Sequence, residues 1–563
     1  MSHCRWNLMP PVSVLPGKEG FSDYSPLLIQ LLHNRGVDRL EDFPSFLASD
    51  RSLMADPFLF NDMQKAVNRI KQALDKGETI AIYGDFDADG ITSTALLVQG
   101  LALLGGKTIP YIPHRQTEGH GLTSPVLKKL QEQGASLVIT VDCGITDVEE
   151  VKTAMETGQD IIITDHHSPL DKIPAALAVI NPKVGSQYPS TILAGVGVAF
   201  KLLQGLFRTL GKEDQLNVVM DLITIGTIAD MSPPLGENRY FIKEGLKEMN
   251  ASPRLGIKEL MNQTRLEAGK MDAEKIGWII APCLNAAGRL ADGLTGYNLL
   301  ITQSDKEAQE LALWLCQKNE ERQRLTAATL ARAREQVIAM GLPPLLITAD
   351  KEYPMGIAGL VASRLTEEFY RPTVVIQMED TICHGSCRSI PEFDIIAALN
   401  KFSSYLSRYG GHAAAAGFTM PTNNLPQLEK ELSALAAEQL AGVELRPHLN
   451  IDAEVKLNEL GGDVYPTTQL LAPFGHGNPV PMFLSRGVEV IEWRTMGNTN
   501  DHLRMRLKQG GSVWDCVAFR LSNHHEEFAP RIDIVYNLEV DNWNGRNKLR
   551  LNVLDFKKSG EQE

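Results

Sequence analysis

The segment GDFDADG at positions 84–90 is the first part of the chain that could do chemistry, because it places three carboxylates within five positions. Carboxylates this close repel one another, so Asp85, Asp87 and Asp89 predict a bound cation that offsets the repulsion. In an extended segment alternate side chains point to the same side, which would give the three carboxylates a common face. Taken alone, the segment is also typical of a solvated acidic turn or a calcium-binding loop.

Further acidic and imidazole side chains follow apolar segments elsewhere in the chain. Asp142 ends one such segment, the triplet Asp165, His166 and His167 ends the next, and Asp230 follows a later helical segment. A single Asp or His in such a place is usually a cap or a structural group, but its recurrence predicts one shared metal site. Oxygen and imidazole ligands suit Mn²⁺ or Mg²⁺, whereas a structural zinc ion would recruit thiolates.

This set of ligands is larger than one cation requires, so we expect two ions in the site. Two divalent cations about 4 Å apart suit in-line displacement at phosphorus, because together they activate the attacking water and neutralise the leaving oxygen. The predicted reaction is therefore phosphoester hydrolysis. Cys383 and Cys387 flank His384 but have no partner pair, so no zinc site is expected there.

The elements that carry these residues have the pattern of a parallel α/β sheet. Short apolar segments at 80–83, 136–142 and 160–164 alternate with helical segments. Continuous apolar strands of this kind imply a sheet covered by helices on both faces. Ligands of such sheets bind at the carboxyl ends of the strands, and this is where the chain carries its polar residues.

The length of 563 residues predicts about three or four domains. In the connecting region a capping box, SDKE, opens a helix expected over 304–340. The last region has short alternating segments separated by turn signals, which is typical of a small barrel such as an OB-fold. We expect an N-terminal lead-in at 1–48, a catalytic α/β domain at 49–240, a helical connector at 241–340, a second α/β domain at 341–440 and a barrel at 446–563.

Composition narrows the class of protein. With 43% hydrophobic and 22% charged residues the chain should be globular, and its net charge of −14 argues against a general nucleic-acid coat protein but leaves room for a local basic groove. No apolar run reaches the roughly 18 residues of a spanning helix, and the start lacks a secretory signal, so a cytoplasmic location is expected. Seven scattered cysteines predict reduced thiols.

The motifs resemble those of the DHH phosphoesterase superfamily. GDFDADG, VDCG at 141–144, DHH at 165–167 and Asp230 are similar to its motif series, and GGHAAAAGF at 410–418 is similar to its companion DHHA1 motif. The order and spacing over 80–420 resemble the RecJ branch, and NAAGRLADG at 285–293 with the OB-like end extends the resemblance across nearly the whole chain. It implies two α/β lobes, DHH and DHHA1, joined by a long helix and followed by an OB-like barrel.

The resemblance also implies an activity, a single-strand-specific DNA exonuclease that works 5′ to 3′ in recombination and repair with help from a helicase and a single-strand-binding protein. The implied metal and catalytic residues are Asp87, Asp89, Asp142, His166, His167 and Asp230. Among them Asp142 is the natural bridging ligand, His167 has phosphate or water as alternative partners, and Asp85 and Asp165 orient the ligands. Tyr83 stands where many superfamily members have a His, which implies weaker binding of the first cation.

Substrate contacts are implied in the same way. Arginine forms bidentate bonds to phosphate, and the resemblance assigns the DNA backbone and the 5′-terminal phosphate to Arg115, Arg289, Ser386 and Arg388. Gly410 and Gly411 would let the backbone approach a nucleotide while His412 donates to phosphate, with tight packing as the alternative. In the barrel, interleaved aromatic and basic residues suggest a stacking platform for single strands, although aromatic residues also fill barrel cores. These are Trp493, Trp514, Trp543, Arg494, Arg504, Arg506, Arg546, Lys548 and Arg550.

Two other functions remain open at this point. A DHH phosphodiesterase for short oligonucleotides or cyclic dinucleotides would share the metal set, but its usual chain is shorter. A non-catalytic replication accessory would share the fold, but such a protein would have lost its ligands. We expect one DNA strand to pass between the two lobes until its 5′ phosphate meets the arginines, which would place the adjacent phosphodiester over the cations.

Overall fold

A computed structural model describes residues 4–12, 23–115, 117–185, 187–497, 500–541 and 548–560. The chain forms two compact units. The larger comprises Asp56–Asp230 and Glu244–Leu445, and the smaller comprises Met1–Ala55, Met231–Lys243 and Arg446–Glu563. In the described part of the chain no helix combines the length and apolar character needed to cross a membrane.

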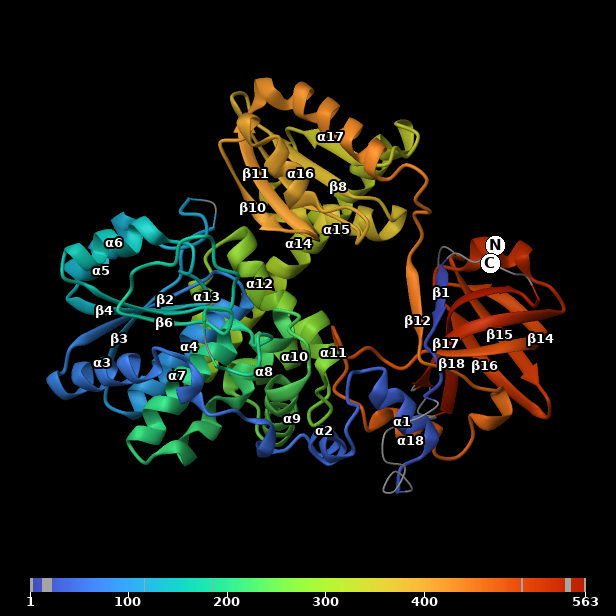
Figure 1. The fold of residues 1–563 in the computed structure, drawn as a ribbon, viewed down its shortest axis with the longest axis horizontal. Helices are drawn as coiled ribbons and strands as arrows, with labels where there is room; N and C mark the ends of the chain where they lie inside the picture. Colours follow the sequence, from blue (N-terminus) through green and yellow to red (C-terminus); the bar gives the residue numbers. More distant parts are fainter. Residues whose placement is uncertain are drawn as a thin grey trace. The chain divides into compact units, whose positions relative to one another are not determined.

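The first sheet of the larger unit has five parallel strands in the order β3-β2-β4-β5-β6. In sequence these are β2 (Thr79–Gly84), β3 (Lys107–Tyr111), β4 (Ala135–Val141), β5 (Asp160–Thr164) and β6 (Ala178–Ile180). Helices α5 (Ser124–Glu132) and α6 (Val148–Glu156) cover one face, and α3 (Met63–Lys76), α4 (Ala88–Leu103) and α7 (Gly195–Thr209) cover the other (Figure 1). The predicted parallel sheet is confirmed.

The strands are apolar because both faces are covered. Ile80, Ile82, Val138 and Ile162 are completely buried, and removing such side chains from water stabilises the fold by about 1.5–3 kcal/mol each. β4 and β5 end immediately before Asp142 and Asp165, so the pattern that drives burial stops where the polar residues begin. The polar residues Asp142 and Asp165 therefore lie together at the carboxyl ends of the strands.

Helices connect this sheet to the second lobe of the larger unit. The predicted long helix is α14 (Asp305–Ala339), and its N-cap Ser304 accepts a hydrogen bond from the backbone of Glu307. The other helices of the region are α8 (Met220–Ala229), α9 (Gly236–Ala251), α10 (Leu255–Thr264), α11 (Ala273–Lys275), α12 (Ala281–Leu290) and α13 (Leu294–Ile301).

The second lobe is a mixed sheet in the order β10-β11-β9-β8-β7, in which only β7 and β8 are parallel. Helix α15 and the end of α14 pack on one face, and α16 and α17 pack on the other. The bounds are β7 (Leu346–Asp350), α15 (Met355–Phe369), β8 (Thr373–Met378), β9 (Ile382–Arg388), α16 (Ile395–Lys401), β10 (Arg408–His412), β11 (Ala415–Pro421) and α17 (Leu425–Gln439).

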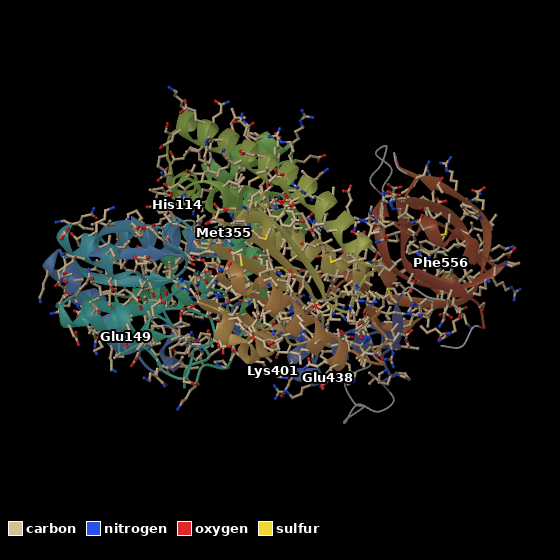
Figure 2. The ribbon with its side chains drawn as sticks, turned by 90° about the horizontal axis from the view of Figure 1, so that it is seen from above. His114, Glu149, Met355, Lys401, Glu438 and Phe556 are labelled. Carbon is tan, nitrogen blue, oxygen red and sulfur yellow. The ribbon has the colours of Figure 1, made fainter. Side chains whose placement is uncertain are left out.

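The smaller unit contains the predicted barrel. Strands close in the order β14-β15-β16-β18-β17, with β17 pairing back to β14. Phe556 (Figure 2) stacks on Phe528 in this core, with ring centroids 4.9 Å apart. The strands are β13 (Ala453–Glu454), β14 (Phe483–Met496), β15 (His502–Gln509), β16 (Ser512–Ala518), β17 (Arg531–Asp541) and β18 (Lys548–Lys558), and α18 (Val464–Gln469) precedes β14.

The N-terminal segment folds with the barrel. β1 (Arg5–Leu8) pairs with β12 (His448–Ile451), and helices α1 (Pro26–His33) and α2 (Phe43–Ala48) contribute Leu31, Leu32 and Phe43 to the barrel core. The lead-in expected from the sequence is therefore a structural part of the smaller unit.

Candidate active site

The acidic loop turns sharply between β2 and α4. Asp87 is the N-cap of α4, and its Oδ1 accepts hydrogen bonds from the backbone N–H groups of Asp89 (3.0 Å) and Gly90 (3.1 Å). Asp87 itself is extended, and Asp85 and Asp87 offer oxygens to one group of ligand atoms. Because α4 begins at Ala88, however, the expected extended alternation does not reach Asp89. Asp89 lies within the first turn of the helix instead.

Asp89 is held by the N-terminus of a second helix. Gly195 N–H donates to its Oδ2 at 2.7 Å, and Val196 N–H donates to its Oδ1 at 2.8 Å. Free N–H groups at a helix start favour negative charge. Both oxygens of Asp89 are thereby oriented by α7.

Asp142 follows β4 in an unusual backbone conformation, with φ of 60°. Its N–H donates to Thr164 O at 3.0 Å, and a Cβ added at Gly195 would lie 2.6 Å from the Asp142 Cβ. A left-handed conformation is costly for a non-glycine residue and persists only where its surroundings enforce it. The tight approach of α7 thus helps to fix the Asp142 carboxylate.

The triplet after β5 contains one orienting carboxylate and two imidazoles. Asp165 accepts hydrogen bonds from the backbone of Ile145, His166 and His167 and from His167 Nδ1, at 2.7–3.0 Å. Burial raises the pKa of Asp165, but these hydrogen bonds outweigh it and the net pKa is lowered. Asp165 therefore stays ionised and fixes the ring of His167.

Ligand-type atoms converge in three overlapping groups, each with its atoms within 4.8 Å of one another. Asp142 belongs to two of them, and so does His166. The groups are Asp142 with His166 and His167, Asp89 with His166 and Asp230, and Asp85 with Asp87 and Asp142. The structure therefore gathers all six residues expected to bind metal, and it adds Asp85.

Two buried atoms in this cluster lack a hydrogen-bond partner. Asp142 Oδ1 and His166 Nε2 are 3.1 Å apart, yet neither makes a hydrogen bond within the described part of the chain. An unpaired buried polar atom is costly. Two neighbouring ligands of an octahedral Mg²⁺ ion, each about 2.1 Å from it, lie about 3 Å apart. The pair therefore fits a shared divalent cation.

The cluster carries more negative charge than it can compensate by itself. Burial, followed by the neighbouring carboxylates, raises the pKa of Asp87 to about 6 and that of Asp89 and Asp142 well above the usual range. Burial lowers the pKa of His166, which keeps its imidazole neutral and able to ligate. Divalent cations would reverse these shifts in the carboxylates, because they favour the charged form.

Tyr83 does not take the role of the His that many superfamily members have at this position. Its ring is fully buried in the core under α5, and its hydroxyl donates to Gly121 O at 2.9 Å. A different imidazole approaches the cluster: His120 Nδ1 lies 3.1 Å from Asp85 Oδ1, and Asp85 raises the pKa of His120 to about 9. His120 is not among the residues predicted from the sequence, although it stands in the same short segment as Arg115.

Three arginines converge beside the cluster. Arg115 follows β3, Arg289 lies on α12 and Arg388 ends β9. Burial lowers the pKa of all three arginines. The charge of Arg115 lowers the pKa of Arg289 and of Arg388 further, and that of Arg289 falls to about 10. Among described residues none of them has a carboxylate within 4.0 Å; Arg289 donates to Gly356 O (3.3 Å) and Arg388 to Cys387 O (2.8 Å). Asp85 and Asp87 act on Arg115 from a greater distance. Three neighbouring guanidinium groups without a direct ion pair to a described carboxylate predict an anion site.

The remaining predicted substrate residues lie on the sheet of the second lobe. Ser386 shares a face of β9 with Arg388. Gly411 has φ of 140°, and a Cβ there would lie 2.3 Å from Ala415 O, so packing of the hairpin explains this glycine. Gly410 has open space around it, and His412 is exposed at the end of β10. Tight packing therefore accounts for one glycine of the pair.

Helix α12 supports the acidic loop directly, a contact that was not predicted from the sequence. Asn285 Oδ1 accepts the N–H of Ala88 at 2.7 Å. A Cβ at Gly288 would lie only 2.1 Å from Phe86 O, so the helix and the loop touch through glycine. The signal was the NAAGRLADG motif, which contains both residues.

The barrel residues divide between core and surface. Trp514 Nε1 donates to Leu457 O at 2.9 Å and its ring packs on the barrel core, whereas Trp493 is 41% exposed. Arg506, Lys548 and Arg550 make ion pairs with carboxylates of the barrel. Trp543 and Arg546 lie outside the described residues.

Three family models match successive parts of the chain: the DHH family N-terminal domain over 79–227, the DHHA1 domain over 337–438 and the RecJ OB domain over 451–555. The chain is 37% identical to the single-stranded-DNA-specific exonuclease RecJ of Bacillus subtilis, over 94% of this chain and 68% of that protein. The chain belongs to the RecJ family. Its RecJ relative from Thermus thermophilus is 33% identical, over 98% of this chain and 79% of that protein.

Solved RecJ structures agree in fold. The Mn²⁺ complex of RecJ from Thermus thermophilus has a TM-score of 0.87 at 31% identity and covers 100% of this chain and 80% of that chain. The corresponding Mg²⁺ complex has a TM-score of 0.80 at 29% identity, over 99% of this chain and 79% of that chain. The expected architecture of DHH lobe, DHHA1 lobe and OB barrel is confirmed.

Proposed function

We propose that this chain is a single-stranded-DNA-specific exonuclease that hydrolyses phosphodiester bonds with Mn²⁺ or Mg²⁺, works 5′ to 3′ and releases 5′-mononucleotides. The observation that carries the proposal is the pair of buried atoms, Asp142 Oδ1 and His166 Nε2, that lack a hydrogen-bond partner among the described residues. They lie at the centre of an acidic cluster, beside three arginines that form no ion pair with a described carboxylate. A cation site next to an anion site is what hydrolysis of a phosphodiester requires.

Two ions would be held by the overlapping ligand groups. Asp89, His166 and Asp230 would bind one, Asp85 and Asp87 would contribute to the other, and Asp142 would join both. When bound, the ions supply an activated water and neutralise charge on the phosphate. Asp165 positions His167, whose ring then contacts a cation, the phosphate or the water.

The arginines would set the 5′ to 3′ direction of digestion. Arg115, Arg289 and Arg388 would bind the terminal 5′ phosphate, because guanidinium groups form paired hydrogen bonds with phosphate oxygens. Ser386, Gly410 and His412 would line the path of the strand on the DHHA1 sheet. The barrel would also bind single-stranded DNA, with Trp493 as an exposed stacking surface.

Partners and location follow from the substrate. We propose a role in DNA recombination and repair in the cytoplasm, where a helicase and a single-strand-binding protein would prepare the strand. The domain assignments 49–240, 241–340, 341–440 and 446–563 belong to the same proposal, with the amendment that Met1–Ala55 and Met231–Lys243 fold with the barrel.

The proposal is tested by digesting single strands labelled at either end, with a 5′ phosphate or a 5′ hydroxyl, in Mn²⁺, Mg²⁺ or EDTA. We expect a label at the 5′ end to be released first as a mononucleotide, faster from the phosphorylated strand, and duplex DNA to resist. Release from the 3′ end, or equal cleavage of duplex DNA, would contradict the proposal.

The second candidate is hydrolysis of short oligonucleotides or cyclic dinucleotides. The same enzyme should be offered a dinucleotide, a cyclic dinucleotide and a long single strand at equal nucleotide concentration. Because the barrel adds binding surface only for a long strand, we expect the highest kcat/KM on the long strand. Preference for the dinucleotide would favour the second candidate.

A further inference from the structure

Two thiols lie in contact between α12 and α14, outside the chemistry proposed above. Cys283 is buried on α12, and Cys316 is half-buried on α14. Their Sγ atoms are 3.9 Å apart, and both residues are free thiols. The two positions are 33 residues apart in sequence, so the packing of the two helices alone brings the sulfur atoms together.

We propose that Cys283 and Cys316 form an oxidation site, at which a peroxide converts the two thiols into a reversible disulfide that ties α12 to α14. A disulfide bond is about 2.05 Å long, so the sulfur atoms must approach by nearly 2 Å. Such a movement is within the reach of side-chain rotation combined with a small helix shift.

Polar side chains of α14 contact the sulfur of Cys283. Asn319 Nδ2 donates to Cys283 Sγ at 3.6 Å, and Arg322 Nε donates to Asn319 Oδ1 at 3.1 Å. The Arg322 charge and the Asn319 amide both act to lower the pKa of Cys283. They lower it less than burial and the bond to Cys316 raise it, so Cys283 stays a protonated thiol and is the residue that attacks second.

Within the pair we assign the first reaction with peroxide to Cys316, because Cys316 is half-buried whereas Cys283 is buried. The hydrogen bond between the thiols lowers the pKa of Cys316, whereas this bond and burial raise the pKa of Cys283. The pKa of the other five cysteines is also raised, chiefly by burial. Cys316 is therefore the one cysteine of the seven, all in the described part of the chain, that is partly exposed and whose pKa is lowered rather than raised.

The chemistry balances with hydrogen peroxide as the oxidant. The Cys316 thiolate attacks one peroxide oxygen, the O–O bond breaks, and hydroxide leaves to give a sulfenic acid. The Cys283 sulfur then attacks the Cys316 sulfur, the S–O bond breaks, and water leaves with the Cys283 proton. The two sulfurs lose two electrons in total, the peroxide gains them, and a dithiol reductant reverses the change.

Closure of the disulfide should disturb the acidic loop. Cys283 lies two residues before Asn285, which holds the Ala88 N–H, and five residues before Gly288, which touches Phe86 O. A shift of α12 therefore changes the start of α4, where Asp87 and Asp89 lie. We expect the oxidised protein to digest single strands at least fivefold more slowly, and a reductant to restore the rate.

The experiment treats the full chain with hydrogen peroxide, blocks the remaining thiols with an alkylating agent, and determines the mass of the non-reduced proteolytic peptides. We expect a cross-linked Cys283–Cys316 peptide whose mass is about 2 Da below the sum of the two peptides, since two hydrogen atoms are lost. Cys316→Ser should abolish the cross-link, and Cys516→Ser, which removes a buried thiol of the barrel, should not.

This mass measurement does not depend on the proposed exonuclease activity, so the two proposals fail separately. Free alkylated Cys283 and Cys316 after peroxide treatment, or a cross-link through other cysteines, would overturn the oxidation site. A cross-link that leaves the digestion rate unchanged would overturn its effect on the acidic loop. Loss of rate in Cys316→Ser under the same peroxide treatment would assign the inactivation to another residue.

Discussion

At the scale of residues, the most informative atoms are those that lack a partner. Asp142 Oδ1 and His166 Nε2 are buried without hydrogen bonds, and three arginines lie nearby without a direct ion pair to a carboxylate, among the described residues. The types and spacing of Asp87, Asp142 and His166 could be read from the sequence, because each follows a buried segment. His120 could not, because its contact with Asp85 depends on how the loop after β3 returns to the sheet.

Asp142, which belongs to two of the three ligand groups, should contribute most to the exonuclease rate. Asp142→Asn keeps the size of the side chain but removes its charge, so we expect the exonuclease rate to fall by more than about 100-fold, since even residues that only support metal ligands cost 10–100-fold. The rate on a long single strand in Mn²⁺ measures this. Glu149→Gln, an exposed change on α6 (Figure 2), is the matched control and should leave the rate unchanged. An active Asp142→Asn variant would show that this carboxylate is not a ligand.

The arginines should recognise the end of the strand. Arg388→Ala removes one guanidinium group, so we expect KM to rise about tenfold for 5′-phosphorylated strands and the salt dependence of binding to weaken by about 0.7 log units per log unit of salt. Arg364→Ala, on an exposed arginine of α15 that pairs with Glu367, is the control. The same loss on strands with a 5′ phosphate and with a 5′ hydroxyl would contradict a role in end recognition.

At the scale of elements, the sheet was predictable and the turn after it was not. Strands β2, β4 and β5 follow from apolar runs that are buried on both faces. The same runs do not reveal that α4 begins at Ala88, so the alternation expected for Asp85, Asp87 and Asp89 does not reach Asp89. What fixes this turn is α12, a helix about 200 positions later, through Asn285 and Gly288.

A substitution that adds one methyl group at position 288 tests the contact between α12 and the acidic loop. In Gly288→Ala the new Cβ would lie 2.1 Å from Phe86 O, so we expect a loss of about 1–3 kcal/mol of stability and a weaker affinity for Mn²⁺. Thermal unfolding and calorimetric Mn²⁺ titration measure the two effects. Gly277→Ala is the control, because its Cβ would meet nothing closer than 3.5 Å. Equal Mn²⁺ affinities of the two variants would show that the contact of α12 with the acidic loop does not influence the metal centre.

At the scale of the whole molecule, the smaller unit joins the two ends of the chain. The sequence predicted the barrel from its short alternating strands, but it did not show that α1, α2 and β1 fold with it. Pairing of β1 with β12 joins Arg5 to His448, and no local pattern reveals a partner so far away in sequence. For the same reason the convergence of arginines from both lobes of the larger unit could not be derived from spacing alone.

A truncation tests this unit. A chain that ends at residue 445 loses the barrel, so Leu31, Leu32 and Phe43 lose their partners, each worth about 1.5–3 kcal/mol of burial. We expect this chain to bind a hydrophobic dye strongly and to aggregate at lower temperature. A chain spanning 56–445 lacks these apolar residues as well and should bind less dye. Equal dye binding by both chains would mean that the N-terminal helices do not depend on the barrel.

The most direct test of the metal centre is electron paramagnetic resonance of the protein titrated with Mn²⁺, compared between the wild-type chain and Asp142→Asn. If Asp142 joins two neighbouring ions, the wild-type spectrum should show two spin-coupled Mn²⁺ ions per chain at saturation, and the coupling should disappear in Asp142→Asn. A wild-type spectrum of isolated ions only, or a coupled pair that persists in the variant, would contradict a cation pair built around Asp142.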